Sequence, residues 1–353
     1  MLFTCRYLLL RSMGVFFFLL VCNILPGQYY FSKLSEENGL SDNRISCFLK
    51  DKSGFIWIGT KNGLNRYDGS EFLLFKPTSG NSISNESIND IVQDSSGNIW
   101  VATFSGLNRY DPITNRWETM MPTGSEHKGN LPSYLIWDLE VDENNCIWIV
   151  SDVWDFAMYN PATKKFTYYD WPETAQQKQF KSFAHYRSIQ KIVRKSKNEW
   201  WLATTIGLFS VDMTSRQFKF FGAGYTGSIM DIQYHSPTNN VFVSIQNGQL
   251  FNYNENEKRY REIKPVQQLY PAVQRKQLQK SNILLASPNG ILDINPVTKE
   301  VTLIEHQPAL PSSILNGGTN IIYSDHTGVV WVGTNKGINF YNSHNQVADF
   351  IPL

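Results

Sequence analysis

The sequence predicts an all-β protein, a seven-bladed β-propeller of four-stranded antiparallel blades. Three observations predict this fold: one phrase recurs along the chain, its copies are spaced at a nearly constant interval, and each copy contains four short strand-like runs. A repeat of about 40–50 residues is typical of architectures whose units bury their apolar faces against their neighbours. The repeat therefore indicates an architecture and leaves the position of a functional site open.

The repeated phrase is clearest in three places. Its first copy reads Asp51-Lys-Ser-Gly-Phe-Ile-Trp57-Ile-Gly-Thr60, and close copies begin at Asp94 and Asp325. Weaker copies lie between them, and aligning all copies on the tryptophan position gives the blade cores Trp57, Trp100, Trp148, Trp201, Phe242, Leu284 and Trp331. The steps between these positions are 43, 48, 53, 41, 42 and 47 residues, so we expect seven blades.

Each unit contains the elements of one blade. In the first unit the strand-like runs are Ile45–Lys50, Phe55–Thr60, Leu64–Tyr67 and Phe72–Lys76. They are rich in β-branched and aromatic residues, and short turns of Gly, Asn, Asp and Ser separate them. Asp51 and Gly54 form a hairpin signal, because Asp bonds nearby amides and Gly supplies a positive φ. We expect the recurrent tryptophan to pack between blades. An all-β solenoid is the structural alternative, but it needs shorter repeats without regular hairpins.

The first strand of each unit departs from simple alternation. Its apolar residues stand three apart, where a regular half-buried strand places them two apart. The pairs are Ile45/Phe48, Ile88/Ile91, Ile136/Leu139 and Ile189/Ile192. This spacing predicts a β-bulge in the first strand.

The two ends of the chain carry more strands than seven blades need. Each unit has its own candidate outer strand, the last being Val347–Ile351, and Tyr29–Leu34 is an additional one. If Tyr29–Leu34 completes the last blade, Val347–Ile351 is left to lead into further sequence. This arrangement favours a fragment of a longer protein over a stand-alone propeller.

Residues 1–27 differ from the rest of the chain and predict a secretory signal peptide. Arg6 and Arg11 precede the apolar run Met13–Leu25, and Pro26-Gly27 follow it. This run is short for a membrane span. We therefore expect residues 28–353 to form the propeller in the periplasm or outside the cell, with an uncleaved membrane anchor as the alternative.

Composition narrows the class of partner. The chain has 353 residues, of which 42% are apolar and 14% aromatic, enough for one large packed domain. Its 32 basic residues balance 31 acidic ones, so the net charge of +1 gives no reason to expect nucleic-acid binding. Outside the leader only Cys47 and Cys146 remain, at non-equivalent positions of the repeat. We expect no disulfide, no metal and no other cofactor.

With the repeat laid out, the chain resembles the two-component regulator propeller family. The resemblance rests on Gly39-Leu-Ser-Asp-Asn-Arg-Ile45, which leads into the phrase at Asp51 and then into Gly63-Leu-Asn-Arg-Tyr67. It implies the periplasmic sensor propeller of a hybrid two-component system histidine kinase, which senses breakdown products of complex carbohydrates. Histidine kinase and response regulator modules, in cis or in trans, and a homodimer are the partners that the resemblance implies.

Signals for catalysis are weak, and we expect no enzymatic activity. The sequence has no Gly-x-Ser-x-Gly, no phosphate-binding Gly loop and no His-Glu-x-x-His. Asp90, Asp138 and Asp231 begin first strands and could meet around a channel, where paired carboxylates support acid–base or glycoside chemistry. Cys47 and Lys191 hold the same position in other blades, however, which favours turn formation or bonds to neighbouring backbone.

A binding surface is easier to predict, because long loops flank the third blade. The loops 120–134 and 171–187 are the two concerned, and this blade also breaks the repeat where other units have Gly-Leu. The candidate ligand-binding residues are Tyr134, Trp137, Trp154, His185, Tyr186 and Arg187. Aromatic planes with polar neighbours suit a sugar ring, which has apolar C–H faces and hydroxyl edges.

The sequence thus predicts an extracytoplasmic sensory propeller that binds an oligosaccharide. The main alternative is a protein–protein interaction scaffold without a small ligand, and a propeller lyase or glycosidase is a further one. For the site itself, the alternative is that Trp137 and Trp154 only pack the loops.

Overall fold

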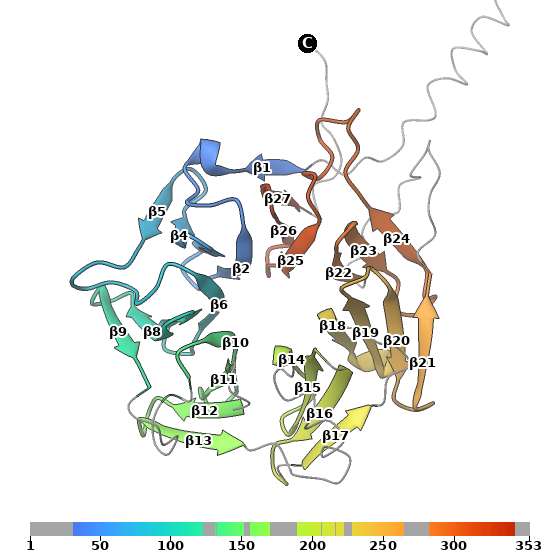
Figure 1. The fold of residues 1–353 in the computed structure, drawn as a ribbon, viewed down its shortest axis with the longest axis horizontal. Helices are drawn as coiled ribbons and strands as arrows, with labels where there is room; N and C mark the ends of the chain where they lie inside the picture. Colours follow the sequence, from blue (N-terminus) through green and yellow to red (C-terminus); the bar gives the residue numbers. More distant parts are fainter. Residues whose placement is uncertain are drawn as a thin grey trace, which may run out of the picture.

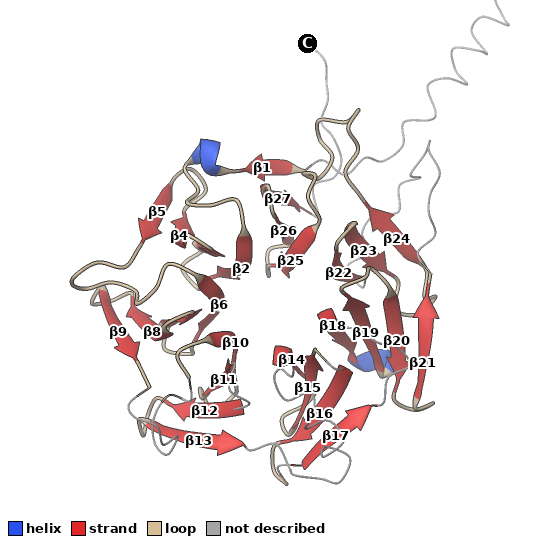
Figure 2. Cartoon of the chain, in the orientation of Figure 1, coloured by secondary structure: helices blue, strands red, loops and turns tan. Residues whose placement is uncertain are grey.

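The computed structural model describes residues 31–122, 131, 133–151, 156–169, 189–205, 207–215, 217–221, 228–264 and 282–342. The predicted leader 1–27 and the candidate strand Val347–Ile351 lie outside these ranges. The described residues form seven antiparallel sheets arranged around a central axis, as predicted (Figure 1). Among the described residues, helix is confined to two single 3₁₀ turns, η1 (Glu36–Asn38) and η3 (Ser236–Thr238) (Figure 2).

The first three blades follow the predicted order, with the first strand nearest the axis (Figure 1). The first blade is β2 (Ile45–Lys50), β3 (Ile56–Thr60), β4 (Gly63–Tyr67) and β5 (Phe72–Phe75). The second is β6 (Ile88–Gln93), β7 (Ile99–Thr103), β8 (Gly106–Asp111) and β9 (Arg116–Met120). The third is β10 (Ile136–Val141), β11 (Ile147–Ser151), β12 (Phe156–Asn160) and β13 (Lys165–Tyr169).

The next three blades repeat the same meander. The fourth is β14 (Ile189–Arg194), β15 (Glu199–Thr204), β16 (Gly207–Asp212) and β17 (Gln217–Phe221). The fifth is β18 (Ile229–His235), β19 (Asn240–Ile245), β20 (Leu250–Asn254) and β21 (Arg259–Ile263). Within the described ranges the sixth has three strands, β22 (Ile283–Ser287), β23 (Gly290–Ile294) and β24 (Val301–Ile304).

The N-terminal strand closes the ring. The seventh blade contains β25 (Thr319–Ser324), β26 (Val329–Thr334), β27 (Gly337–Asn342) and, as its outer strand, β1 (Ser32–Leu34). β1 pairs antiparallel with β27, with Lys33 opposite Asn339. The strand predicted at Tyr29–Leu34 therefore completes the blade that the C-terminal part of the chain begins.

The recurrent tryptophan packs between blades, as predicted. Trp57 lies 5.5 Å from the ring of Tyr110 in the second blade, and Trp100 lies 5.6 Å from Tyr159 in the third. Both tryptophans are fully buried. Trp201 lies opposite Val193 in the same register that places Trp57 opposite Leu49, so the alignment on Trp201 is correct.

The aspartate and the tryptophan of the phrase are bonded to each other, a contact that sequence reasoning missed. Asp51 Oδ1 accepts hydrogen bonds from the amides of Ser53 and Phe55 and so holds the turn. Its Oδ2 accepts one from Trp57 Nε1 at 2.7 Å. The same bond joins Asp94 to Trp100, Asp142 to Trp148 and Asp325 to Trp331. One carboxylate therefore fixes both the turn and the inter-blade tryptophan.

The predicted bulge is present in the first strand of six blades. In β2 the pairing with β3 shifts between Ile45 and Cys47, and the other first strands shift at the same place. The residues inside the bulge are Ser46, Asn89, Trp137, Gln190, Met230 and Asn320. All six are half-buried or exposed, whereas the residue before each of them is buried.

The two cysteines within the described residues, Cys47 and Cys146, are free and buried, and burial raises the pKa of both thiols.

Within the described ranges, no helix has the length and hydrophobicity needed to cross a bilayer.

Candidate functional site

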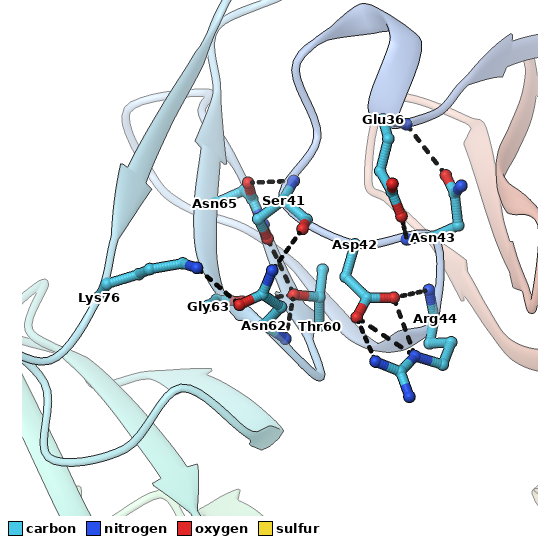
Figure 3. A network of polar contacts seen from close by, with 10 residues as sticks. All are labelled: Glu36, Ser41, Asp42, Asn43, Arg44, Thr60, Asn62, Gly63, Asn65 and Lys76. Atoms are coloured by element: carbon cyan, nitrogen blue, oxygen red, sulfur yellow. Dashed lines mark hydrogen bonds and ion pairs between the residues drawn. The ribbon is translucent and has the colours of Figure 1, made fainter.

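One face of the ring carries both the loops between blades and the turns between second and third strands; we call it the upper face. On the first blade the loop before β2 is bonded to the β3–β4 turn (Figure 3). The amide of Ser41 donates to Asn65 Oδ1 at 3.2 Å, and its hydroxyl contacts that of Thr60 at 2.9 Å. Asn62 Nδ2 donates to the Ser41 carbonyl at 3.0 Å. The loop is thus held by the blade that it leads into.

The same device recurs and extends across blades. In the second blade Ser84 is bonded to Asn108 and Thr103 in the same way. In three blades the turn glycine also donates to the loop of the next blade: Gly63 to the carbonyl of Glu86, Gly106 to that of Tyr134 and Gly337 to that of Asn43. Gly106 has a φ of +99°, and a Cβ there would lie 2.7 Å from the Met120 carbonyl oxygen, so the turn requires glycine. These bonds make this part of the upper face a connected frame.

An aromatic cluster lies on this frame where the first three blades meet. The rings of Phe104, in the β7–β8 turn, and Trp137, in the bulge of β10, are 5.8 Å apart and edge-on. Lys61, in the β3–β4 turn, places its Nζ 4.8 Å from the centre of the Phe104 ring. Phe104 and Tyr134 keep 41% and 56% of their surface exposed. We call Lys61, Asn89, Phe104, Tyr134 and Trp137 the upper-face cluster.

The polar members of the upper-face cluster hold each other in place. Lys61 Nζ donates to Asn89 Oδ1 at 3.2 Å, and Asn89 Nδ2 donates to the carbonyl of Ile136 at 2.7 Å. Asn89 occupies the bulge of β6 as Trp137 occupies that of β10. Burial lowers the pKa of Lys61 from its ordinary value. The cluster thus combines exposed rings with a fixed amide and a partly desolvated ammonium group.

Two of the six predicted site residues lie in the upper-face cluster. Tyr134 and Trp137 are described, and Tyr134 sits in the loop bonded to Gly106. Trp154, His185, Tyr186 and Arg187 lie outside the described residues, so their part of the site stays a prediction. Sequence reasoning missed Phe104 and Lys61. Both residues directly follow the threonine of the repeated phrase. At this position the second copy has an aromatic residue where the first has a polar one, and this difference was the signal that could have identified Phe104.

The aspartates of the first strands bond the backbone of the next blade. Asp90 Oδ2 accepts the amide of Leu139 at 2.8 Å, and Asp138 Oδ2 accepts that of Ile192 at 2.6 Å. Asp231 Oδ2 accepts the amide of Ala286, while its Oδ1 pairs with Lys191 at 2.7 Å. The prediction that these aspartates bond neighbouring backbone is confirmed. They join adjacent blades close to the axis.

Burial changes the acidity of the carboxylates in this inner region. It raises the pKa of Asp90 to about 6 and that of Glu140 to about 7, and the charge of Asp90 adds to the effect on Glu140. Burial, followed by the charge of Asp90, also raises the pKa of Asp138. Lys191 keeps a raised pKa although burial opposes it, because Asp231 lies beside it.

Replacing Glu140 with Gln is expected to stabilise the protein at pH 8 by about 1–2 kcal/mol and to leave its stability near pH 4 almost unchanged. The pKa of Glu140 is raised from 4.5 to about 7 in the folded chain, so the wild type loses stability as the pH rises between these two values and loses no more above them. Urea unfolding at both pH values measures the difference. The exposed control Glu71→Gln should change the free energy of unfolding by the same amount at both pH values. If Glu140→Gln also had the same effect at both, the assignment of a raised pKa to Glu140 would be wrong.

Comparison with known proteins agrees with the repeat. Residues 39–62 and 82–105 match the family model described as two component regulator propeller. Over 73 residues the chain is 29% identical to histidine kinase P4 of Formosa agariphila, a stretch that is 19% of this chain and 5% of that kinase.

Solved structures share the fold. The extracellular domains of two putative hybrid two component systems from B. thetaiotaomicron superpose with TM-scores of 0.72 and 0.68, at 21% and 19% identity. The similarity covers 89% of this chain in both cases, and 42% and 40% of those chains. The propeller domain of Cps50 (Swd1) from Myceliophteria thermophila superposes with a TM-score of 0.59 at 10% identity, over 88% of this chain and 99% of that one. The chain thus spans about two fifths of the length of the two extracellular domains.

The fold defines the class of this protein: a seven-bladed β-propeller. Segments of its first two units match the model of the two component regulator propeller family, which the sequence resembles.

Proposed function

We propose that this chain is the ligand-binding sensor propeller of an extracytoplasmic two-component system and that it binds an oligosaccharide on its upper face. The observation that carries the proposal is the exposed Phe104 ring beside Trp137, with Tyr134, also exposed, in the adjoining loop whose carbonyl is bonded to Gly106. Monomeric proteins rarely keep several aromatic rings exposed at one place on a rigid frame without a ligand to cover them. The signal would pass to histidine kinase and response regulator modules, in cis or in trans.

The chemistry of the upper-face cluster suits a sugar. A pyranose ring packs its C–H faces on aromatic planes, and its hydroxyl groups need fixed hydrogen-bonding partners. Asn89 and Lys61 supply such partners next to Phe104. Because loops and turns are bonded across blades, little conformational entropy is lost when a ligand binds.

The aspartates of the first strands also favour binding over catalysis as the function of this protein. Asp90, Asp138 and Asp231 each accept a backbone amide of another blade, which commits one oxygen of each to the scaffold. An acid–base pair needs at least one carboxylate directed at substrate. The contacts of these aspartates favour a structural role.

A second function is favoured by one observation on the outside of the ring. Leu73 and Leu74 in the outer strand β5 are both exposed. This strand has no charged residue within its bounds, whereas charged side chains commonly protect sheet edges against pairing. An apolar edge of this kind suits a protein–protein scaffold or a homodimer, which is compatible with a ligand on the upper face.

Calorimetry against a panel of oligosaccharides tests the proposal. Trp137→Ala and Phe104→Ala should each weaken the binding of a responding sugar by about tenfold or more, because stacking area is lost. Ile113→Ala, which truncates an exposed apolar residue at the opposite end of the second blade, should leave binding unchanged. The proposal fails if the folded wild type binds no sugar, or if the two cluster variants bind as the wild type does.

A further inference from the structure

The strongest unassigned feature of the upper-face cluster is the ammonium group of Lys61. Its Nζ donates to a neutral amide oxygen, Asn89 Oδ1, and lies over the Phe104 ring. Among the described residues it forms no ion pair. An ammonium group has three donors, and these two contacts leave one of them for a ligand.

One other cation on the same face, Arg44, is paired with an acid. Arg44 forms a bidentate contact with Asp42, with Nη2 2.6 Å from Oδ2 and Nε 3.0 Å from Oδ1 (Figure 3). The Arg44 guanidinium beside Asp42 holds the pKa of that carboxyl below its ordinary value. The structure thus pairs Arg44 directly with an acid, whereas the direct contacts of Lys61 are to neutral groups and the charge of Asp42 acts on it only from a distance.

The surroundings of Lys61 make this arrangement costly without an anion. Burial lowers its pKa, and a partly desolvated charge without a counter-charge is unfavourable. The Phe104 ring compensates in part, because a cation over an aromatic face is attracted by its quadrupole. An anionic group brought to Nζ would supply the missing counter-charge in a site of low polarity, where the attraction is stronger than in water.

We propose that Lys61 makes the upper-face cluster a site for an acidic oligosaccharide, one that carries a carboxylate or a sulfate ester beside a sugar ring. This inference rests on the proposed function. The sugar ring packs against Phe104 and Trp137, and its anionic substituent reaches the Lys61 ammonium group. Asn89 holds that ammonium group over one face of the Phe104 ring. A neutral sugar would use the same rings and leave the charge of Lys61 unpaired.

A pair of probes that differ only in charge isolates the effect of Lys61. Trigalacturonic acid and its fully methyl-esterified form supply the carboxylate arm. A sulfated galactan oligosaccharide and its desulfated form supply the sulfate arm. Titration calorimetry should show at least one acidic probe binding about tenfold or more tightly than its neutral counterpart. Its affinity should fall as the salt concentration rises.

Variants at two lysines separate recognition from general surface charge. Lys61→Gln should remove the preference for the acidic probe and its dependence on salt, while affinity for the neutral probe stays within about twofold of the wild type. Lys61→Arg should keep much of the preference. Lys76→Gln removes the same charge from a lysine whose Nζ donates to Asn62 Oδ1 and contacts no member of the cluster, so the preference should remain.

The outcomes distinguish this inference from the proposed function. If neutral and acidic forms bind equally well, or Lys61→Gln weakens both to the same extent, the site binds sugars and the inference about charge is wrong. If Lys76→Gln has the same effect as Lys61→Gln, the preference comes from net surface charge and the inference is again wrong. If no probe and no other sugar binds, both the inference and the proposed function are wrong.

Discussion

Replacing Asp94 with Ala is expected to lower the free energy of unfolding by about 3–5 kcal/mol. The side chain is 1% exposed, and its two oxygens accept several bonds within the repeated phrase. Oδ1 accepts the amide of Asn98 at 2.9 Å, and Oδ2 accepts both Trp100 Nε1 and Asn98 Nδ2. Alanine would leave the buried Trp100 donor and the two half-buried Asn98 donors unsatisfied, and a buried unsatisfied donor costs about 1–3 kcal/mol.

Urea unfolding of wild type and variant measures this loss, with Asp68→Ala as the control. Asp68 also holds a turn, accepting the amides of Ser70 and Glu71, but it is exposed and has no tryptophan partner. Its replacement should cost about 1 kcal/mol or less. Equal losses at the two positions would show that the tryptophan bond contributes nothing. The fourth blade shows that a blade can form without this bond, because Lys195 replaces the aspartate and Trp201 Nε1 has no hydrogen-bond partner.

Truncating Phe31 to Ala is expected to destabilise the protein by about 3 kcal/mol, because this residue anchors the strand that closes the ring. Phe31 is 6% exposed and lies 5.1 Å from the ring of Tyr341, edge-on. Its amide donates to the carbonyl of Ser312 in the loop between the sixth and seventh blades. The cavity left by alanine would weaken the contact between the N-terminal strand and both blades.

Two measurements identify the cause of this loss. Urea unfolding gives its size, and hydrogen exchange of the β27 amides reports whether β1 has detached. Ile113→Ala removes an apolar side chain that is 89% exposed and should change neither quantity. A loss of stability without faster exchange in β27 would mean that Phe31 fills space and does not secure closure.

Most of the fold could be predicted from local chemistry. Turns at Asp51 and Gly54, the strands between them and the period of the tryptophan depend on residues close in sequence, and repetition made the pattern visible seven times. The bulge also followed from spacing, since Ile45 and Phe48 stand three apart. The bond between Asp51 and Trp57 could not be predicted in this way, because it depends on where the indole points once the next blade is packed against it.

The candidate site was less predictable for a related reason. Long loops drew attention to the third blade, and Trp137 does lie beside the exposed ring of Phe104, while the carbonyl of Tyr134 is bonded to the same turn at Gly106. Lys61 and Phe104 belong to turns of two different blades, and only the packing of these neighbouring blades brings them together. Variation at a turn position within a repeat is ordinary, so nothing in one unit alone indicates that its residue contacts the next unit.

The bulge in the first strands has a consequence for how such a protein can change over evolution. In six blades it places one side chain outside the core while the residues on either side carry the packing and the bonds to the next blade. Ser46, Asn89, Trp137 and Met230 show how different these side chains can be on one unchanged backbone. The ring therefore offers a circle of positions where substitution leaves the scaffold intact, and new specificities can arise there one blade at a time.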